Sequence, residues 1–234
     1  MSQFSSTEVE CPACGSPVKV ELVHSVNADR MPELRRRIVD ESFQVTSCPK
    51  CGNSFRVEPD FNYVEHGRDL WIAALPLERL PRWREEEAEA EALFERVYGP
   101  RGSPFMQAIG ERIARRMTFG WAAVREKLVI ADAGLDDVTV ELVKSAVLRA
   151  SASAPVGLGA EMRLVGADAE KLHFAWLSSI DEAVAQTMHA SRQLYDQIAA
   201  DEGGDWAPLR EQLAAGMFVD LNRLLVASEP ASSA

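Results

Sequence analysis

The amino-acid sequence predicts an α+β fold in three consecutive parts, and three observations support this. Short alternating apolar stretches flank two cysteine-containing turns in residues 1–78. Residues 79–150 carry apolar side chains at helical spacing, interrupted by proline and glycine. Residues 160–228 return to alternating stretches and end in helical ones. We therefore expect an N-terminal β unit, central helices and a small C-terminal α+β unit.

The two cysteine-containing turns are near copies of each other. CPACGSPVKV begins at Cys11 and CPKCGNSFRV begins at Cys48, and all four cysteines of the chain lie in these stretches. The proline after each first cysteine pre-sets the backbone for a turn. The glycine after each second cysteine permits a positive φ, so that the chain folds back with amide groups toward sulfur. Strands are expected beside the turns at Val18–Val20, Phe43–Val45 and Phe55–Val57.

Cysteines separated by two residues are typical of a metal site, because both sulfurs of one tight turn reach the same ion. One turn supplies two of the four ligands of a tetrahedral site, so we interpret the repeat as two halves of one coordination sphere. Four protein ligands leave no position open for a substrate, which predicts one structural zinc ion. An iron electron-transfer centre and thiol redox chemistry are the alternatives. The predicted metal ligands are Cys11, Cys14, Cys48 and Cys51.

A short helix is expected between the two turns, within ADRMPELRRRIVDES. Asp29 is placed near its start as the cap, and Pro32 lies just inside its first turn. Leu34 and Ile38 share one face, which we expect to be buried.

The sequence around these turns resembles the CpXC family, which is named for two such CPxC motifs. The resemblance extends through SVNADRMPELRRRIVDESFQVTSCPKCGNSFRVEP, NYVEHGRDLWIAALP and LVIADAGLDDVTVELVKSAVL. It covers about residues 8–150 and, more weakly, the stretch SRQLYDQIAAD. The resemblance implies a bacterial protein in which the four cysteines bind metal, and it carries over no catalytic residues.

The residues after the second turn predict a hairpin and then helices. Phe61–Leu75 is expected to form the hairpin, turning at residues 65–69. A helix from Trp83 to Gly99 places Leu93, Phe94 and Val97 on an apolar stripe. A second helix is expected over SPFMQAIGERIARRMTF, followed by helices in FGWAAVREKLVIADAGL and DDVTVELVKSAVLRA. In the helix expected over SPFMQAIGERIARRMTF, Ser103 is the cap, and the apolar positions at helical spacing are Met106, Ile109, Ile113 and Met117.

The last part of the chain predicts a small sheet with helices. Residues 150–160, ASASAPVGLGA, are interpreted as a linker because they are small and lack periodicity. EMRLV and KLHFAWL flank a turn, and AVAQTMHA is a candidate third strand. Helices are expected in SRQLYDQIAA, DWAPLREQLAAG and MFVDLNRLLV.

Charge and hydropathy restrict the partners. The formal net charge of −11 disfavours nucleic acid, whose phosphates it repels, and the only compact basic run, residues 35–37, is interpreted as a solvated helix face. No apolar run reaches the ~20 residues of a membrane helix, and the N-terminal residues do not read as a secretory signal. We therefore expect a cytoplasmic protein with a protein partner or a homo-oligomeric state, and no contact with a membrane.

No catalytic residue is predicted. The four histidines, His24, His66, His173 and His189, have no second ligand at metal-binding spacing, and His24 is only a candidate to approach the metal from outside the coordination sphere. We therefore expect a non-enzymatic zinc-binding protein whose surface serves protein–protein interaction or self-association. The alternatives are a nucleic-acid-associated zinc-ribbon protein of transcription type, a rubredoxin-like or thiol redox protein, and an enzyme with a cleft between its units.

Overall fold

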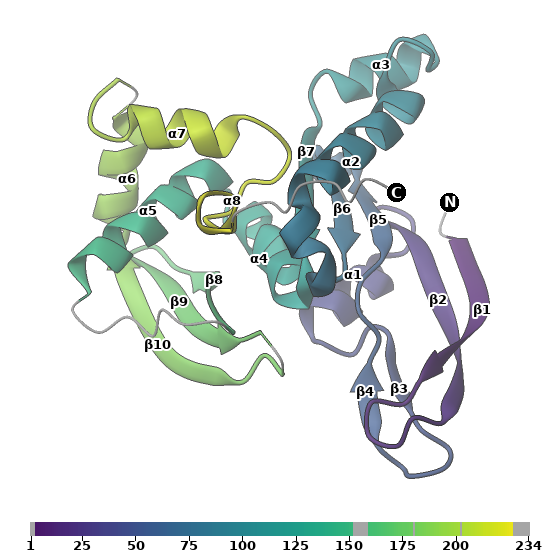
Figure 1. The fold of residues 1–234 in the computed structure, drawn as a ribbon. Helices are drawn as coiled ribbons and strands as arrows, with labels where there is room; N and C mark the ends of the chain where they lie inside the picture. The colour runs from purple at the N-terminus through teal and green to yellow at the C-terminus, as the bar shows by residue number, and fades with distance from the viewer. Residues whose placement is uncertain (1–2, 152–158, 180, 202, 227–234) are drawn as a thin grey trace. The chain divides into compact units, whose positions relative to one another are not determined.

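The computed structural model describes residues 3–151, 159–179, 181–201 and 203–226. Residues up to 80 together with 88–121 form one compact unit, and residues 81–87 together with those from 122 onward form a second (Figure 1). Both contain helices and strands, which confirms the predicted α+β class. The three-part division of the chain at 1–78, 79–150 and 160–228 stays a prediction. Among the described residues, no helix combines the length and hydropathy needed to cross a membrane.

The first unit is built on a five-stranded mixed sheet with the order β1-β2-β5-β6-β7. The β1–β2 and β5–β6 pairs are antiparallel, whereas β2–β5 and β6–β7 are parallel. Its strands are β1 (Gln3–Glu10), β2 (Pro17–Asn27), β5 (Phe61–Glu65), β6 (Leu70–Leu75) and β7 (Ala114–Phe119). The predicted hairpin is confirmed, with the 3₁₀ turn η1 (His66–Arg68) between β5 and β6.

A separate two-stranded sheet carries the second cysteine turn. It consists of β3 (Val45–Ser47) and β4 (Ser54–Arg56), paired antiparallel. The predicted strand at Phe43–Val45 is wrong in its first two residues, because Gln44 adopts a left-handed φ of 58°. Phe43 is instead buried in an aromatic cluster with Phe61 and Trp121.

Helix α1 (Pro32–Val39) lies between the two cysteine turns as expected, with Leu34 and Ile38 buried. The predicted cap at Asp29 is wrong, since the helix starts after Met31 without a side-chain cap. The Asp29 carboxylate accepts hydrogen bonds from the amides of His66 and Gly67 at 2.7 and 3.0 Å. It therefore satisfies the turn between β5 and β6 instead of the helix.

Helix α2 (Trp83–Tyr98) follows the 3₁₀ segment η2 (Leu77–Arg82) and has the predicted start. Its first turn belongs to the second unit and the remainder to the first. In the first unit the buried side chains are Ala90, Phe94 and Tyr98, whereas Val97 is 44% exposed. The predicted apolar stripe is therefore wrong at Val97.

The single helix predicted over residues 103–119 is wrong in its second half. Helix α3 (Pro104–Gly110) is capped by Ser103 as expected, but Ala114–Phe119 form strand β7. Met117 lies opposite Ala73 in the parallel β6–β7 ladder. The apolar residues Ile109, Ile113 and Met117 are all buried. Their spacing is compatible with a helix, but pairing with the edge of β6 makes Ala114–Phe119 a strand.

The second unit combines helices with an antiparallel three-stranded sheet of order β10-β9-β8. The meander confirms the predicted strands, and Ser191 caps α6 as predicted. Of the predicted linker at 150–160, residues 152–158 lie outside the described residues. The elements are α4 (Gly120–Asp132), whose first residues belong to the first unit, α5 (Asp137–Ala150), β8 (Ala160–Ala167), β9 (Lys171–Ser178), β10 (Val184–Ser191), α6 (Arg192–Ala200), α7 (Ala207–Ala214) and α8 (Asn222–Leu225).

The hydrophobic core of the second unit lies between one face of this sheet and the helices. Leu164 and Phe174 on the sheet and Leu142 and Val143 on α5 are at most 1% exposed. Further contributions come from α6, α7 and the segment after α7, through Ile198, Leu213 and Val219.

Candidate metal centre

The two cysteine turns have the same backbone hydrogen bonds. In the turn between β1 and β2, the Gly15 amide donates to the Cys11 carbonyl at 2.9 Å, and in the turn between β3 and β4 the Gly52 amide donates to the Cys48 carbonyl at 2.9 Å. Both glycines adopt positive φ, at 65° and 74°. A second bond closes each turn, from Cys11 N to the Ser16 carbonyl and from Cys48 N to the Asn53 carbonyl. The sequence repeat is therefore a structural repeat.

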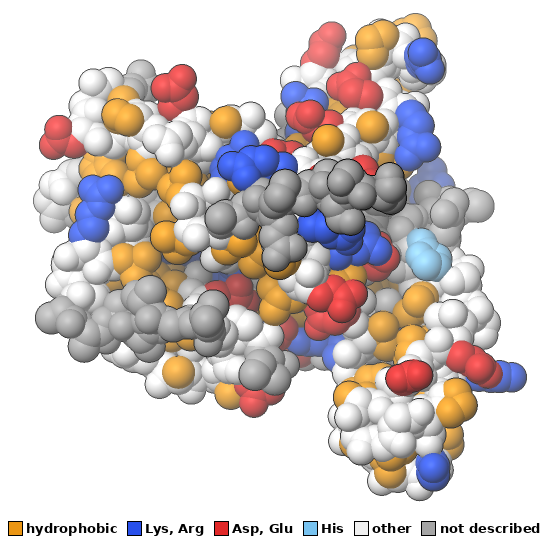
Figure 2. Space-filling model, viewed as in Figure 1, with side chains coloured by type: hydrophobic (Ala, Val, Ile, Leu, Met, Phe, Trp, Pro, Cys, Tyr) orange, Lys and Arg blue, Asp and Glu red, His pale blue; other side chains and the backbone are white. Residues whose placement is uncertain are grey.

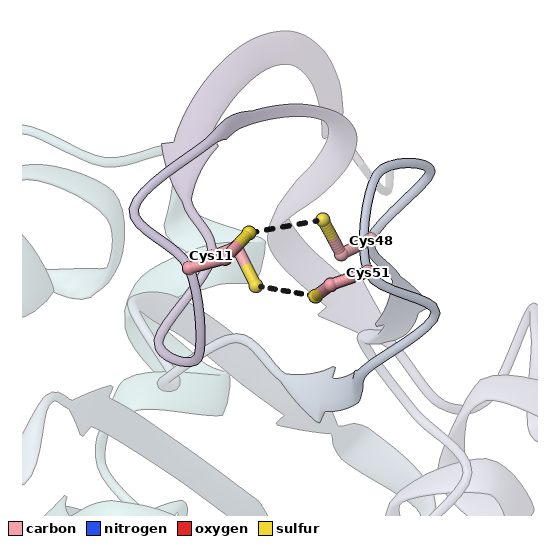
Figure 3. A group of neighbouring side chains, drawn as sticks. Cys11, Cys48 and Cys51 are labelled. Atoms are coloured by element: carbon pink, nitrogen blue, oxygen red, sulfur yellow. Dashed lines mark hydrogen bonds between the residues drawn. The ribbon is translucent and has the colours of Figure 1, made fainter.

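The two turns bring all four sulfurs together. Cys11 Sγ lies 3.7 Å from Cys51 Sγ, and Cys14 Sγ lies 3.8 Å from Cys48 Sγ. All four sulfurs lie within 4.8 Å of one another. Figure 3 shows Cys11 facing Cys48 and Cys51 across the space between the two turns. The four predicted ligands thus come from two separate hairpins and converge on one centre.

These distances fit one tetrahedral ion and exclude disulfides. Sulfur atoms at a Zn–S distance of about 2.3 Å occupy tetrahedral corners roughly 3.8 Å apart. The separations of 3.7 and 3.8 Å match that edge. A disulfide would need about 2.05 Å, and all four cysteines are free. The four thiols therefore provide a closed donor set for a tetrahedral metal.

Apolar side chains pack against the buried side of the four-cysteine cluster. Cys11 and Cys48 are 2% exposed, whereas Cys14 and Cys51 face solvent. Val18 and Val20 of β2 are also buried and form one hydrophobic cluster with Cys11 and Cys48. The partly buried members are Val9, Leu22, Phe55 and Val57. Each turn thus contributes one sheltered and one accessible sulfur.

Hydrogen bonds to sulfur favour thiolates on both turns. The side chain and amide of Ser16 lower the pKa of Cys14 to about 6. The amides of Cys51 and Lys50 lower the pKa of Cys48.

Cys51 behaves in the opposite way. The Asn53 amide favours its thiolate, but the neighbouring thiols, Cys14 foremost, and local desolvation raise the pKa of Cys51 to about 12. Four thiolates at this spacing repel one another, so a cation is needed before all four ionise. The donor chemistry fits a divalent metal.

Sequence reasoning missed the supporting role of Ser16 and Asn53. Each follows the turn glycine, at the same place in the repeat, and each supplies an amide to the sulfur before it. Their shared position after the turn glycine is the sequence feature that could have indicated this role.

The histidines lie elsewhere. His24 is hydrogen-bonded to Ser5 of β1 at 2.6 Å, and His66 lies 3.2 Å from the Tyr98 hydroxyl. His173 contacts Asp168 at 2.7 Å, and His189 lies opposite His173 in the β9–β10 ladder. Within the described part of the chain, no histidine joins the cysteine cluster.

A second group with metal-ligand chemistry lies in the second unit, where carboxylate oxygens of Glu126, Glu141 and Asp220 lie within 4.8 Å of one another. Lys144 contacts Glu126 and Glu141 at 2.6 and 2.7 Å, and Arg163 contacts Glu126 and Asp220. The chain's own cations therefore occupy the positions where a metal would bind. Sequence reasoning missed this cluster, because its members read as the solvated residues of amphipathic helices.

Comparison with known proteins agrees with the cysteine geometry. The family model described as CpXC protein matches residues 9–144, more than half of the chain. The chain belongs to the CpXC family. The CpXC match contains both cysteine turns and ends within α5, so the second unit's three-stranded sheet and its last helices lie beyond it. No curated protein and no solved structure matches the chain significantly.

Proposed function

We propose that the four cysteines of this CpXC protein bind one zinc ion with a structural role, and that the metal fixes two hairpins as a surface for a protein partner or for self-association. The observation that carries the proposal is the convergence of sulfurs from two separate hairpins at tetrahedral spacing. A donor set of four protein ligands is typical of structural zinc. Thiols that remain reduced suit a cytoplasmic location.

The small size of the second hairpin supports a structural role. β3 and β4 have three residues each and pair only with each other among the described strands. An isolated two-stranded hairpin is marginally stable at best. Binding energies of about 10–16 kcal/mol for zinc in small sites exceed what so short a ladder provides. Metal binding therefore supplies the stability that the hairpin lacks.

The test combines metal content with hydrogen exchange. Native mass spectrometry of the full chain should find one zinc ion per protein, and a sample that stays colourless after oxidation in air excludes a tetrathiolate iron centre. Cys48→Ser should lose the metal and the exchange protection of the Gly52 amide, which bonds to the Cys48 carbonyl. Ser54→Ala, in the same hairpin, is the matched control and should keep both. A metal-free chain with protected hairpin amides would overturn the proposal.

A further inference from the structure

We infer that a groove beside the two cysteine hairpins binds an extended, acidic peptide segment of a protein partner by strand addition. This inference names a partner class for the surface proposed above and rests on that proposal. The groove has a volume of about 270 Å³. It is lined by residues of β1, β2, α1, β3 and the segments next to β3 and β4: Phe4, Lys19, Val20, Glu21, Val23, Leu34, Arg37, Phe43, Gln44, Val45, Thr46 and Val57.

Two strand edges border the groove. β2 pairs with β1 along one side, but on the other side it pairs with β5 only at Ser25–Asn27. In the described structure, residues 17–24 therefore have no strand partner on that side. β3 pairs with β4 alone. Lys19 and Glu21 of β2 and Val45 of β3 line the same groove. The alternation of the two antiparallel ladders turns the backbone groups of these residues away from β1 and β4, so an incoming strand finds unpaired groups at the groove walls.

The lining offers apolar contacts for alternate side chains of such a strand. Phe4 and Val45 are 46% and 45% exposed, which is high for large apolar residues in strands. Val23, Leu34 and Phe43 are buried beneath them. Figure 2 shows hydrophobic side chains among charged ones of both signs at this hairpin end of the first unit. Successive strand residues point to opposite faces, so every second residue of a bound segment would contact this apolar lining.

Local charge selects an acidic segment. The lining contains the cations Lys19 and Arg37 and one carboxylate, Glu21, in a chain whose formal net charge is −11. Arg37 is exposed on α1, where its guanidinium also lies over the Phe43 ring at 5.7 Å. Carboxylates on the outward positions of a bound strand would meet these cations here and repulsion over much of the remaining surface.

Both walls of the groove adjoin the four-cysteine cluster. β3 ends at Ser47, directly before Cys48, and Val20 of β2 packs in the cluster that includes Cys11 and Cys48. Zinc bound by Cys11 and Cys48 would therefore connect the β2 wall of the groove to the β3 wall.

The experiment uses the zinc-loaded full chain and fluorescence anisotropy of labelled hexapeptides. The probe alternates valine and glutamate, and its matched controls alternate valine and lysine or carry N-methyl groups on the central amides. We expect the valine–glutamate probe to bind at least about tenfold more tightly than either control, a difference of about 1.4 kcal/mol. Equal affinity for the lysine or N-methylated peptide would overturn charge selection or strand pairing, respectively.

Two variants locate the binding surface. Val45→Glu places a carboxylate on the groove wall and should weaken probe binding at least about tenfold. Val184→Glu changes a valine of β10 that is 60% exposed in the second unit, and it should leave binding within about twofold. A native-mass dimer that Val45→Glu dissociates, together with no probe binding, would assign the groove to a second copy and overturn the proposal.

Zinc content and hairpin exchange protection are measured on every sample. One zinc ion and protected hairpins without probe binding refute the groove alone. Protected hairpins without zinc refute the structural role of the metal.

Discussion

Lys144 and Glu126 form an ion pair of 2.6 Å inside the second unit, and their side chains are 2% and 0% exposed. Lys144 also contacts Glu141 at 2.7 Å, one helical turn before it on α5. The Glu126 carboxylate accepts further bonds from the Leu164 amide at 2.6 Å and from Arg163 at 2.9 Å. Charged groups buried in this way are tolerated only because each has a partner.

Lys144→Met should reduce the free energy of unfolding by about 3–5 kcal/mol, because it leaves two buried carboxylates without their shared cation. Urea unfolding followed by circular dichroism measures the change. The control Arg149→Met lies on the same helix, at an exposed position where the guanidinium faces the Trp206 ring, and should cost about 1 kcal/mol or less. If Lys144→Met also reduced the free energy of unfolding by only about 1 kcal/mol or less, the buried network would contribute no more than a surface contact.

Glu141→Gln should change the pH dependence of stability. Burial raises the pKa of Glu141 from 4.5 to about 7, against the attraction of Lys144. Between these values the folded chain retains a proton that the unfolded chain releases, so this group lowers the free energy of unfolding as pH rises from 4.5 to 7. Glutamine does not titrate, and that component of the slope should disappear.

The measurement compares urea unfolding of wild type and variant below and above this window. Glu211→Gln, at an exposed position of α7, is the control and should keep the wild-type slope. A wild-type slope in Glu141→Gln would mean that Glu141 is already ionised throughout the window.

Glu87→Ala should loosen the segment before α8. Glu87 on α2 accepts a hydrogen bond from the Phe218 amide at 2.8 Å and pairs with Arg223 at 2.8 Å. A hydrogen bond to a charged group contributes about 1.5–3 kcal/mol, so exchange of the Phe218 amide should accelerate roughly 10- to 100-fold. Glu89→Ala, at an exposed position on the same helix, should leave that amide unchanged. Equal exchange rates in the two variants would contradict the assigned role of Glu87.

Trp121→Phe should destabilise the first unit by about 1–3 kcal/mol, since it removes the indole N–H that donates to the Val57 carbonyl at 2.9 Å. Trp121 also packs against Phe43 and Phe61, contacts that a phenylalanine largely retains. Thermal unfolding measures the loss. Phe105→Leu changes an aromatic residue that is 72% exposed and should shift stability by less than about 0.5 kcal/mol. If Trp121→Phe left the stability unchanged, solvent would be donating to the Val57 carbonyl in place of the indole N–H.

The four-cysteine cluster could be predicted from the sequence because each cysteine turn is a local structure. Proline, glycine and the two-residue spacing determine its backbone within ten residues, and the repeat implies the second half of the site. The caps at Ser103 and Ser191 and the meander β8–β10 were equally local, and all are confirmed. Two expectations that failed, the Asp29 cap and the helix over Ala114–Phe119, depended on partners distant in the chain. Asp29 binds the amides of a hairpin about 37 residues away instead of its own helix.

The sequence by itself therefore determined which residues form the two cysteine turns and most elements around them, because those choices depend on neighbours within one or two turns of chain. Only the tertiary structure decided that Ala114–Phe119 become a strand, since the ladder with β6 outweighs a helical spacing that was equally compatible with burial. It also decided that Glu126, Glu141, Lys144, Arg163 and Asp220 are buried. Their charges become compatible with the interior only when α4, α5, β8 and the segment before α8 bring opposite signs together.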